Sequence, residues 1–518
     1  MTTPAEYSPS TRLTLRRPAL MWAVALGLLA DALLRTPGRP GLNAALCALV
    51  GAAVVIMLLR RRCDPPARES VWMVGAAFVL VAALTLRDSE SLAVFSVFGA
   101  MVLLGMAAGR AATAWAANAL PSDVAFSAIR VGLLGAAGPL GWGRGDPDAV
   151  PTSTGVSRGG RTLLRGTLMA LPPLLFLGAL LMSADEVFAR IIRDTFQIDF
   201  EMVVQHVALT AVIAWGSAGY LRALLVPDDD IMSQLRVPRP GLPAAEISVA
   251  LWILNLLFLA FMAVQLRYLF GGATLVEVTP GLTYADYARK GFFELVAAAT
   301  LVVPILVAAD WAAAQENERS RTVLRGTAVV LVVLLVGVIA SAAYRMWLYQ
   351  QAYGLTEDRV YGSVFIAWLT VSLGWLVYTV LRGRRERFAL GTIVAGLAAI
   401  ASLYVLNPDA LIARVNVDRM AAGKVFDGEY VAALSGDAVP VLVSRLDRLP
   451  EVERCKAIRM LKERWTGERR GGWRTWNLSD ARARRVVAPL TIPATCPPPP
   501  PPATAPASSS APVAPGNR

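Results

Sequence analysis

The sequence predicts an all-α, polytopic membrane protein with about eleven transmembrane helices, and three observations support this class. First, 55% of the 518 residues are hydrophobic and 17% are charged, whereas soluble domains carry nearer a quarter charged residues. Second, apolar runs of roughly 16–22 residues recur, a length that matches the ~30 Å hydrocarbon core of a bilayer. Third, nearly every second connection between these runs is rich in Arg, which indicates on which side of the membrane each connection lies.

The apolar runs define the order of the elements. The expected spans are 18–34, 41–59, 71–86, 91–109, 166–183, 202–221, 247–266, 291–309, 326–344, 360–381 and 388–407. They divide the chain into an N-terminal membrane region (1–110, about four helices), a cytoplasmic connection (111–162), a membrane core (163–410, about seven helices), a small extracytoplasmic helical domain (411–490) and a disordered proline-rich tail (491–518).

The charges of the connections predict the orientation. The Arg-rich connections follow the second, fourth, eighth and tenth spans, and they share the parity of the basic N-terminus. The connections of opposite parity carry mainly acidic residues, such as Asp88, Asp185 and Glu357. Positive charge stays on the cytoplasmic side, so we expect a multi-pass protein of the bacterial cytoplasmic (inner) membrane with its N-terminus inside and its C-terminus outside.

Composition also narrows the function. The formal net charge of +12 is spread over many connections, which disfavours nucleic acid as a partner. A single histidine, His206, excludes sites that need two His ligands. Neither a phosphate-binding Gly-rich loop nor a Gly-x-Ser-x-Gly motif occurs. We therefore expect no metal, no cofactor and no assigned catalytic residue, with the lipid bilayer and an envelope protein, bound through the C-terminal domain, as partners.

Ionisable groups at membrane depth are the candidates for a binding site, because burying them in a bilayer is unfavourable without a purpose. By the predicted orientation they gather at the outer face. The candidates are Glu294, Arg345, Arg267, Gln265, Tyr287, Arg289, Tyr349, Tyr353 and Asp185.

Helical spacing connects several of these candidates. Arg345, Tyr349 and Tyr353 recur every four residues and so share one face of a helix. Glu294 needs a partner or a proton, and Arg345 or Arg267 is the expected partner. Such a pair among Tyr hydroxyls suits a small anion, a sugar or a lipid headgroup. It equally fits a structural ion pair that locks three helices.

The C-terminal region has the composition of a soluble helical domain. Helical periodicity runs through 430–446 and 451–465, and Ser435-Gly436-Asp437 is expected to break the first stretch, with Asp437 as the N-cap of the helix after the break. Cys455 and Cys496 lie 41 residues apart. They form a disulfide if this region lies in an oxidising compartment and are otherwise two free thiols.

Four runs resemble a known group of proteins. They are Leu181-Met-Ser-Ala-Asp-Glu-Val-Phe188, Gln265-Leu-Arg-Tyr-Leu-Phe-Gly-Gly272, Tyr284-Ala-Asp-Tyr-Ala-Arg-Lys-Gly-Phe-Phe-Glu-Leu295 and Tyr344-Arg-Met-Trp-Leu-Tyr-Gln-Gln-Ala-Tyr-Gly-Leu-Thr356. The group is the bacterial multi-pass membrane proteins catalogued as domain-of-unknown-function families 4173 and 4153. The resemblance covers roughly residues 160–440, leaving the first 110 residues and the tail outside. It implies a membrane protein and no particular reaction.

Three functions are compatible with these features. The favoured one is a non-enzymatic envelope protein that senses, binds or scaffolds through its outer face and C-terminal domain. The second is a secondary transporter of a small solute with Glu294 as the coupling carboxylate. The third is a membrane enzyme that modifies a lipid or sugar carrier.

Overall fold

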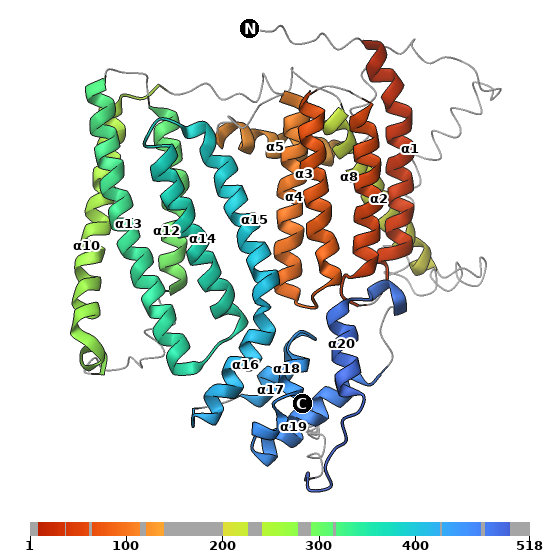
Figure 1. The fold of residues 1–518 in the computed structure, drawn as a ribbon. Coiled ribbons are helices and arrows are strands. Elements are labelled where there is room, and N and C mark those ends of the chain that lie inside the picture. Colours follow the sequence, from red (N-terminus) through yellow and green to blue (C-terminus); the bar gives the residue numbers. More distant parts are fainter. Residues whose placement is uncertain are drawn as a thin grey trace, which may run out of the picture.

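A computed structural model describes residues 9–36, 38–61, 65–113, 121–138, 200–225, 241–277, 292–313, 318–424, 427–467 and 472–497. Within these ranges the chain folds into helices and forms no strand, apart from an isolated bridge between Leu242 and Ala313. The predicted all-α class is thus confirmed. The helices form two groups within the membrane region, with a smaller helical domain at one end (Figure 1).

The first group contains six helices: α1 (Pro9–Leu34), α2 (Leu42–Arg60), α3 (Pro65–Ala82), α4 (Glu90–Thr113), α5 (Pro121–Ala137) and α8 (Phe200–Leu225). Their shared core includes Leu58 and Leu59 of α2 and Leu221 and Leu224 of α8, all of which are almost completely buried. α5 lies across the ends of its neighbours in this group and packs on α4 and α8 (Figure 1).

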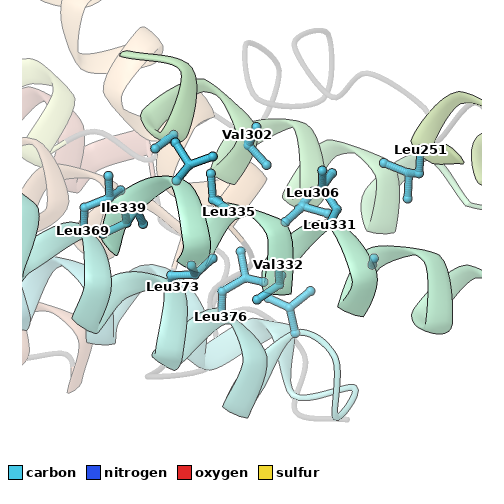
Figure 2. Close-up of a cluster of buried hydrophobic side chains, with 14 of the residues drawn as sticks. Leu251, Val302, Leu306, Leu331, Val332, Leu335, Ile339, Leu369, Leu373 and Leu376 are labelled. Carbon is cyan, nitrogen blue, oxygen red and sulfur yellow. The ribbon is translucent and has the colours of Figure 1, made fainter. Parts of the chain in front are cut away.

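The second group contains five helices: α10 (Ala244–Glu277), α12 (Phe292–Ala312), α13 (Glu318–Tyr353), α14 (Glu357–Thr379) and α15 (Phe388–Leu406). Figure 2 shows its core, in which Leu331 and Leu335 of α13 meet Leu373 and Leu376 of α14. Leucines and valines interdigitate here at helical spacing, so α13 is the central packing surface of this group.

The spans agree closely with the sequence pattern. Within the described residues, nine helices are long and apolar enough to cross a membrane, and each coincides with an expected span. The expected span 71–86 matches a shorter apolar helix, Ser70–Thr85. The expected span 166–183 lies outside the described residues.

The outer surfaces of these helices are apolar. Trp72 is 81% exposed and Val405 is 86% exposed, and many other large hydrophobic side chains face outwards. An apolar surface of this extent would be unstable in water. It is therefore the surface that lipid covers, which is why the helices need little apolar burial against one another.

The C-terminal domain consists of five helices: α16 (Pro408–Ala421), α17 (Gly428–Ala433), α18 (Val439–Val443), α19 (Glu451–Trp465) and α20 (Leu478–Val487). They enclose a small core that includes Ile412, Leu461 and Val487. A disulfide joins Cys455 to Cys496, with 5.5 Å between the two Cα atoms. The domain sits at the end of the bundle opposite the start of α1 (Figure 1).

One expectation for this domain is wrong. Asp437 follows the predicted helix break, but it does not cap α18. The N-cap of α18 is Ala438, which makes no side-chain capping hydrogen bond. The Asp437 carboxylate is instead bound by groups from the membrane bundle.

The packing of α13 yields a prediction. Leu335→Ala should lower the free energy of unfolding by about 2–4 kcal/mol, because Leu335 is fully buried and truncation leaves a cavity. Val333→Ala, at a side chain 65% exposed on the same helix, should change it by less than about 0.5 kcal/mol. Unfolding in mixed detergent micelles measures both, and equal effects would contradict the packing described for α13.

Candidate functional site

A buried polar cluster joins the C-terminal domain to the adjacent ends of the membrane helices, and we call it the junction. Six segments contribute to it: the α1–α2 connection, the α3–α4 connection, the start of α14, α16, the α17–α18 connection and the start of α20. Its residues are Arg39, Arg87, Asp88, Ser89, Glu357, Tyr361, Asp409, Ser435, Gly436, Asp437 and Asn477.

A sharp turn at Asn407 positions one side of the junction. Asn407 has φ 53°, the only positive φ of a non-glycine residue in the described chain, and asparagine tolerates this left-handed region better than most residues. Pro408 follows as the first residue of α16. A backbone N–H at this position would have no acceptor within the helix, so the N–H that proline lacks is not missed. The turn ends α15 and places Asp409 in the first turn of α16, against the adjacent ends of the bundle helices.

An ion pair between Arg87 and Asp437 crosses the junction. Arg87 Nη1 donates to Asp437 Oδ1 at 3.0 Å, and its Nη2 donates to the carbonyl oxygen of Tyr404 at 2.6 Å. The backbone N–H of Asp88 donates to the other oxygen, Asp437 Oδ2, at 2.9 Å. The Asp437 side chain is only 4% exposed. Both of its oxygens are thus bound by one turn of the membrane bundle.

Asp88 makes the reciprocal contacts into the C-terminal domain. Its carboxylate accepts from the backbone N–H of Gly436 at 3.1 Å, from Asn477 Nδ2 at 3.3 Å and from Arg39 Nη1 at 3.4 Å. Burial raises the pKa of Asp88 above its ordinary value, while Arg39 and the Gly436 N–H oppose that shift. Asp88 and Asp437 therefore bind each other's backbone turns.

Gly436 is required by this close approach. A Cβ on Gly436 would lie 2.9 Å from the Trp465 ring and 3.4 Å from Asp88 Oδ2. A side chain at this position would push the two turns apart. The helix break at Ser435-Gly436-Asp437 thus serves to bring backbone against backbone.

Asp409 is the most deeply buried carboxyl group of the junction, with 1% of its surface exposed. The Ser435 hydroxyl donates to its Oδ2, whereas no donor faces its buried Oδ1. The Glu357 carboxyl group, at the start of α14, acts electrostatically on the Asp409 carboxyl group. Burial raises the pKa of Asp409, Ser435 opposes the shift, and the nearby carboxylates of Asp437 and Asp88 raise the pKa further.

A second set of contacts fixes α16 to the turn between α13 and α14. Asn416 accepts from the Leu355 N–H at 2.9 Å and donates to the Leu355 carbonyl oxygen at 2.8 Å. Arg419 donates to the carbonyl oxygens of Gln351 and Ala352 at 2.8 and 3.0 Å, which satisfies the C-terminal end of α13. The C-terminal domain is therefore held by both helix groups.

The α1–α2 connection provides a third attachment. The Leu42 N–H, at the start of α2, donates to the carbonyl oxygen of Trp476 at 3.0 Å. A Cβ on the preceding Gly41 would lie 2.6 Å from that same oxygen. The backbone of the α1–α2 connection thus lies directly against the backbone at Trp476, and position 41 has no room for a side chain.

The predicted pairing of Glu294 with Arg345 is not formed. Arg345 is buried and donates to Gln265, which is also buried. Glu294 is exposed in the first turn of α12, and the ion pairs among described residues do not include one between Glu294 and Arg345. The physical reason is that a neutral amide oxygen can accept from a buried guanidinium in place of that carboxylate. The Arg267 side chain lies outside the described residues, so its pairing with Glu294 stays a prediction.

The predicted face of Tyr349 and Tyr353 does form a contact. Their rings meet edge to face with centroids 5.3 Å apart. The guanidinium carbon of Arg359 lies 3.9 Å from the centroid of the Tyr349 ring, a cation–π contact that the sequence did not suggest. Asp185, Tyr287 and Arg289 lie outside the described residues.

Two groups of charged residues were missed from the sequence. Asp31 and His206 meet at 2.6 Å between Oδ2 and Nδ1, joining α1 to α8. Of the junction residues, Asp88 and Glu357 were treated only as loop charges that set topology, and Asp437 only as a helix cap. The acidic character of the α3–α4 connection was a usable signal, but Asp88 and Asp437 are 349 residues apart, a pairing that one sequence does not reveal.

The family comparison bears on both sides of the junction. Residues 74–444 match the family described as Domain of unknown function (DUF4153). The chain belongs to this family. No curated protein and no solved structure matches the chain. The match begins in α3, so the expectation that the first 110 residues fall outside the family is wrong. The family region includes Arg87 and Asp88 on one side and Asp409 and Asp437 on the other.

An apolar groove lies beside the junction, on the lipid-facing side of the same helices. It has a volume of about 260 Å³ and is lined by residues of α4, α14 and α15, including Phe95, Phe98, Trp368 and Leu403. Tyr361 lines the end of the groove that is nearest to the junction. There the hydroxyl oxygens of Tyr361 and Ser89 are 3.0 Å apart. No group of three or more metal-binding side chains occurs among the described residues.

The ion pair yields a prediction. Arg87→Ala should destabilise docking of the C-terminal domain by about 2–4 kcal/mol, because it leaves the buried Asp437 carboxylate without its cation. Arg39→Ala should have an effect below about 1 kcal/mol, because Arg39 is 41% exposed and 3.4 Å from Asp88. Protection of the Gly436 amide from hydrogen exchange reports docking in both variants. Equal protection in the two would contradict the assigned roles.

Proposed function

We propose that this integral membrane protein is a non-enzymatic envelope protein that senses, binds or scaffolds through its docked C-terminal domain. The proposal includes a location in the bacterial cytoplasmic membrane, with the N-terminus inside and the C-terminal domain outside. It also includes a relation to family 4173, which rests on the run 284–294.

One observation carries the proposal: the oxygens of Asp88 and Asp437 are all bound by donors from the protein itself. Asp437 accepts from Arg87 and from the backbone of Asp88. Asp88 accepts from Gly436, Asn477 and Arg39. Carboxylates that serve as general acid or base must reach a substrate. The Asp88 and Asp437 carboxylates instead use all their oxygens to accept hydrogen bonds across the domain boundary. This arrangement is suited to hold a ligand-binding or partner-binding domain against a membrane bundle.

The outside location of the domain has two supports. The Arg-rich connections favour retention of the opposite end in the cytoplasm. The disulfide between Cys455 and Cys496 suits an oxidising compartment, because disulfides are rarely stable in the cytosol. Both arguments support a junction at the outer face of the membrane.

Orientation can be tested with single-cysteine variants. A variant that retains only Cys496 should react with a membrane-impermeant thiol reagent in intact spheroplasts, because Cys496 is partly exposed in the C-terminal domain. A variant that retains only Cys63, in an Arg-rich connection, should react only after lysis. The reverse pattern of labelling would overturn the proposed orientation.

Function can be tested by site-specific photocrosslinking in cells. A photoreactive residue in place of Trp473, which is 57% exposed on the C-terminal domain, should give a discrete adduct with an envelope protein. The adduct should be reduced when Arg87→Ala is added and unchanged when Arg39→Ala is added, because only the first undocks the domain. An adduct whose yield is the same in Arg87→Ala and in the wild type would contradict the proposal. Solute uptake by proteoliposomes that is lost in Glu294→Gln would establish transport instead.

A further inference from the structure

Asp409 and Glu357 form a contact that requires a proton. The two carboxyl groups act on each other electrostatically at close range, where two ionised carboxylates would repel each other and would have no hydrogen to share. Asp409 is buried, and its Oδ1 faces no donor from the described residues. A proton on one of the two groups supplies the missing donor. The pair then resembles other close carboxyl pairs, in which one proton is shared because both groups cannot ionise together.

The surroundings of the pair favour a proton over a second negative charge. Glu357 begins α14 in the membrane bundle, whereas Asp409 belongs to the C-terminal domain. Carboxyl groups outnumber guanidinium groups around them. The charged and titratable groups that face the pair are Arg39, Asp88, Asp358, Tyr361, Tyr430, Asp437 and Arg464. Arg87 and Asp480 lie one step further away, against Asp437 and Asp88.

The other members of the junction do not offer the same site. Asp88 and Asp437 accept hydrogen bonds from arginine, amide and backbone donors on every oxygen, so their charged forms fit the contacts. A metal ion is a poor alternative occupant, because the described residues contain no group of side chains suited to hold one. The orphaned oxygen of Asp409 therefore points to a proton as its ligand.

We propose that Glu357 and Asp409 form a proton-binding site through which the extracytoplasmic proton concentration controls docking of the C-terminal domain. This inference rests on the proposed function and names the stimulus that the docked domain senses. A proton bound between α14 and α16 holds the domain in place. Its loss leaves two negative charges, a buried one on Asp409 and a half-buried one on Glu357, and their repulsion favours the undocked state.

The sign of the pH dependence is set by the direction of the pKa shift. Burial raises the pKa of Asp409 in the docked state above its value in the undocked state. A group of this kind stabilises docking at low pH, where it is protonated in both states, and this stabilisation is lost as pH rises through the docked-state pKa. Docking should therefore weaken on the alkaline side and strengthen on the acidic side.

Hydrogen exchange in the full-length protein in lipid nanodiscs tests the proposal. The Asp88 and Gly436 amides donate across the junction, so their protection, corrected for the intrinsic exchange rate, measures docking. In the wild type this protection should fall by about tenfold per pH unit above the docked-state pKa, as expected for the loss of one proton. In Glu357→Gln the fall should be clearly smaller than in the wild type, because an amide donates to Asp409 at every pH, and the remaining slope should be that of Asp88, whose pKa burial also raises.

Two further variants make the outcome decisive. Asp409→Asn should also reduce the pH dependence, which provides a second test if Glu357→Gln does not fold. Glu90→Gln is the matched control: Glu90 is exposed at the same face, 3.9 Å from Arg39, and this variant should retain the wild-type profile. A wild-type profile that is flat with pH would overturn the proton site, as would a pH dependence of wild-type steepness in both amide variants.

Added Ca²⁺ or Na⁺ separates a proton from a cation. Protection at alkaline pH that is restored by either ion would overturn the proton site and assign a cation site. These outcomes differ from failure of the proposed function. Loss of Trp473 crosslinks with intact pH-dependent docking would reject the partner role alone, whereas pH-independent docking with intact crosslinks would reject only the proton as stimulus.

Discussion

The burial of carboxylates between the membrane bundle and the C-terminal domain is the constraint on which the rest of the structure depends. Asp88, Asp409 and Asp437 are each at least nine-tenths buried, and a buried charge is unstable without partners. Arg87 supplies the cation for Asp437, and the buried backbone turns at Asp88 and Gly436 supply N–H donors. The sharp turn at Asn407 and the bare backbone at Gly436 are needed so that these partners can reach one another.

Because of this constraint, the C-terminal domain also contributes to the stability of the membrane bundle. Within each helix group, leucine and valine cores such as Leu335 with Leu373 hold neighbouring helices together. Lipid surrounds the groups and provides no hydrophobic drive for their association. The C-terminal domain binds the α3–α4 turn through Asp437 and the α13–α14 turn through Asn416. It therefore links the two groups at the same end of the bundle, and a change in docking would affect both.

Much of the fold was readable from the sequence, because membrane spans depend on local properties. Run length and hydropathy identify the helices without any knowledge of their neighbours, and the expected spans recur as helices wherever the chain is described. The family match over residues 74–444 adds the membrane class and no activity. Helical periodicity likewise located α19 at Glu451–Trp465.

The candidate site was less readable, because its contacts join residues far apart in the chain. Asp437 looked like a helix cap since aspartate after a glycine break commonly has that role; its true partner is Arg87, 350 residues away. Arg345 looked like the partner of Glu294 because both are ionisable and predicted at one depth, but it hydrogen-bonds to Gln265. Spacing identifies which residues share a face and leaves open which faces meet.

A double-mutant cycle on Arg87 and Asp437 tests the central claim most directly. Arg87→Met, Asp437→Leu and the double variant remove one or both members of the pair, and docking is followed by hydrogen exchange at Gly436. A lock across the domain boundary predicts a coupling energy of about 1.5–3 kcal/mol, with the double variant more stable than either single variant would suggest. Additive effects, with a coupling below about 0.5 kcal/mol, would show that the two side chains do not hold the domain together and would contradict the lock.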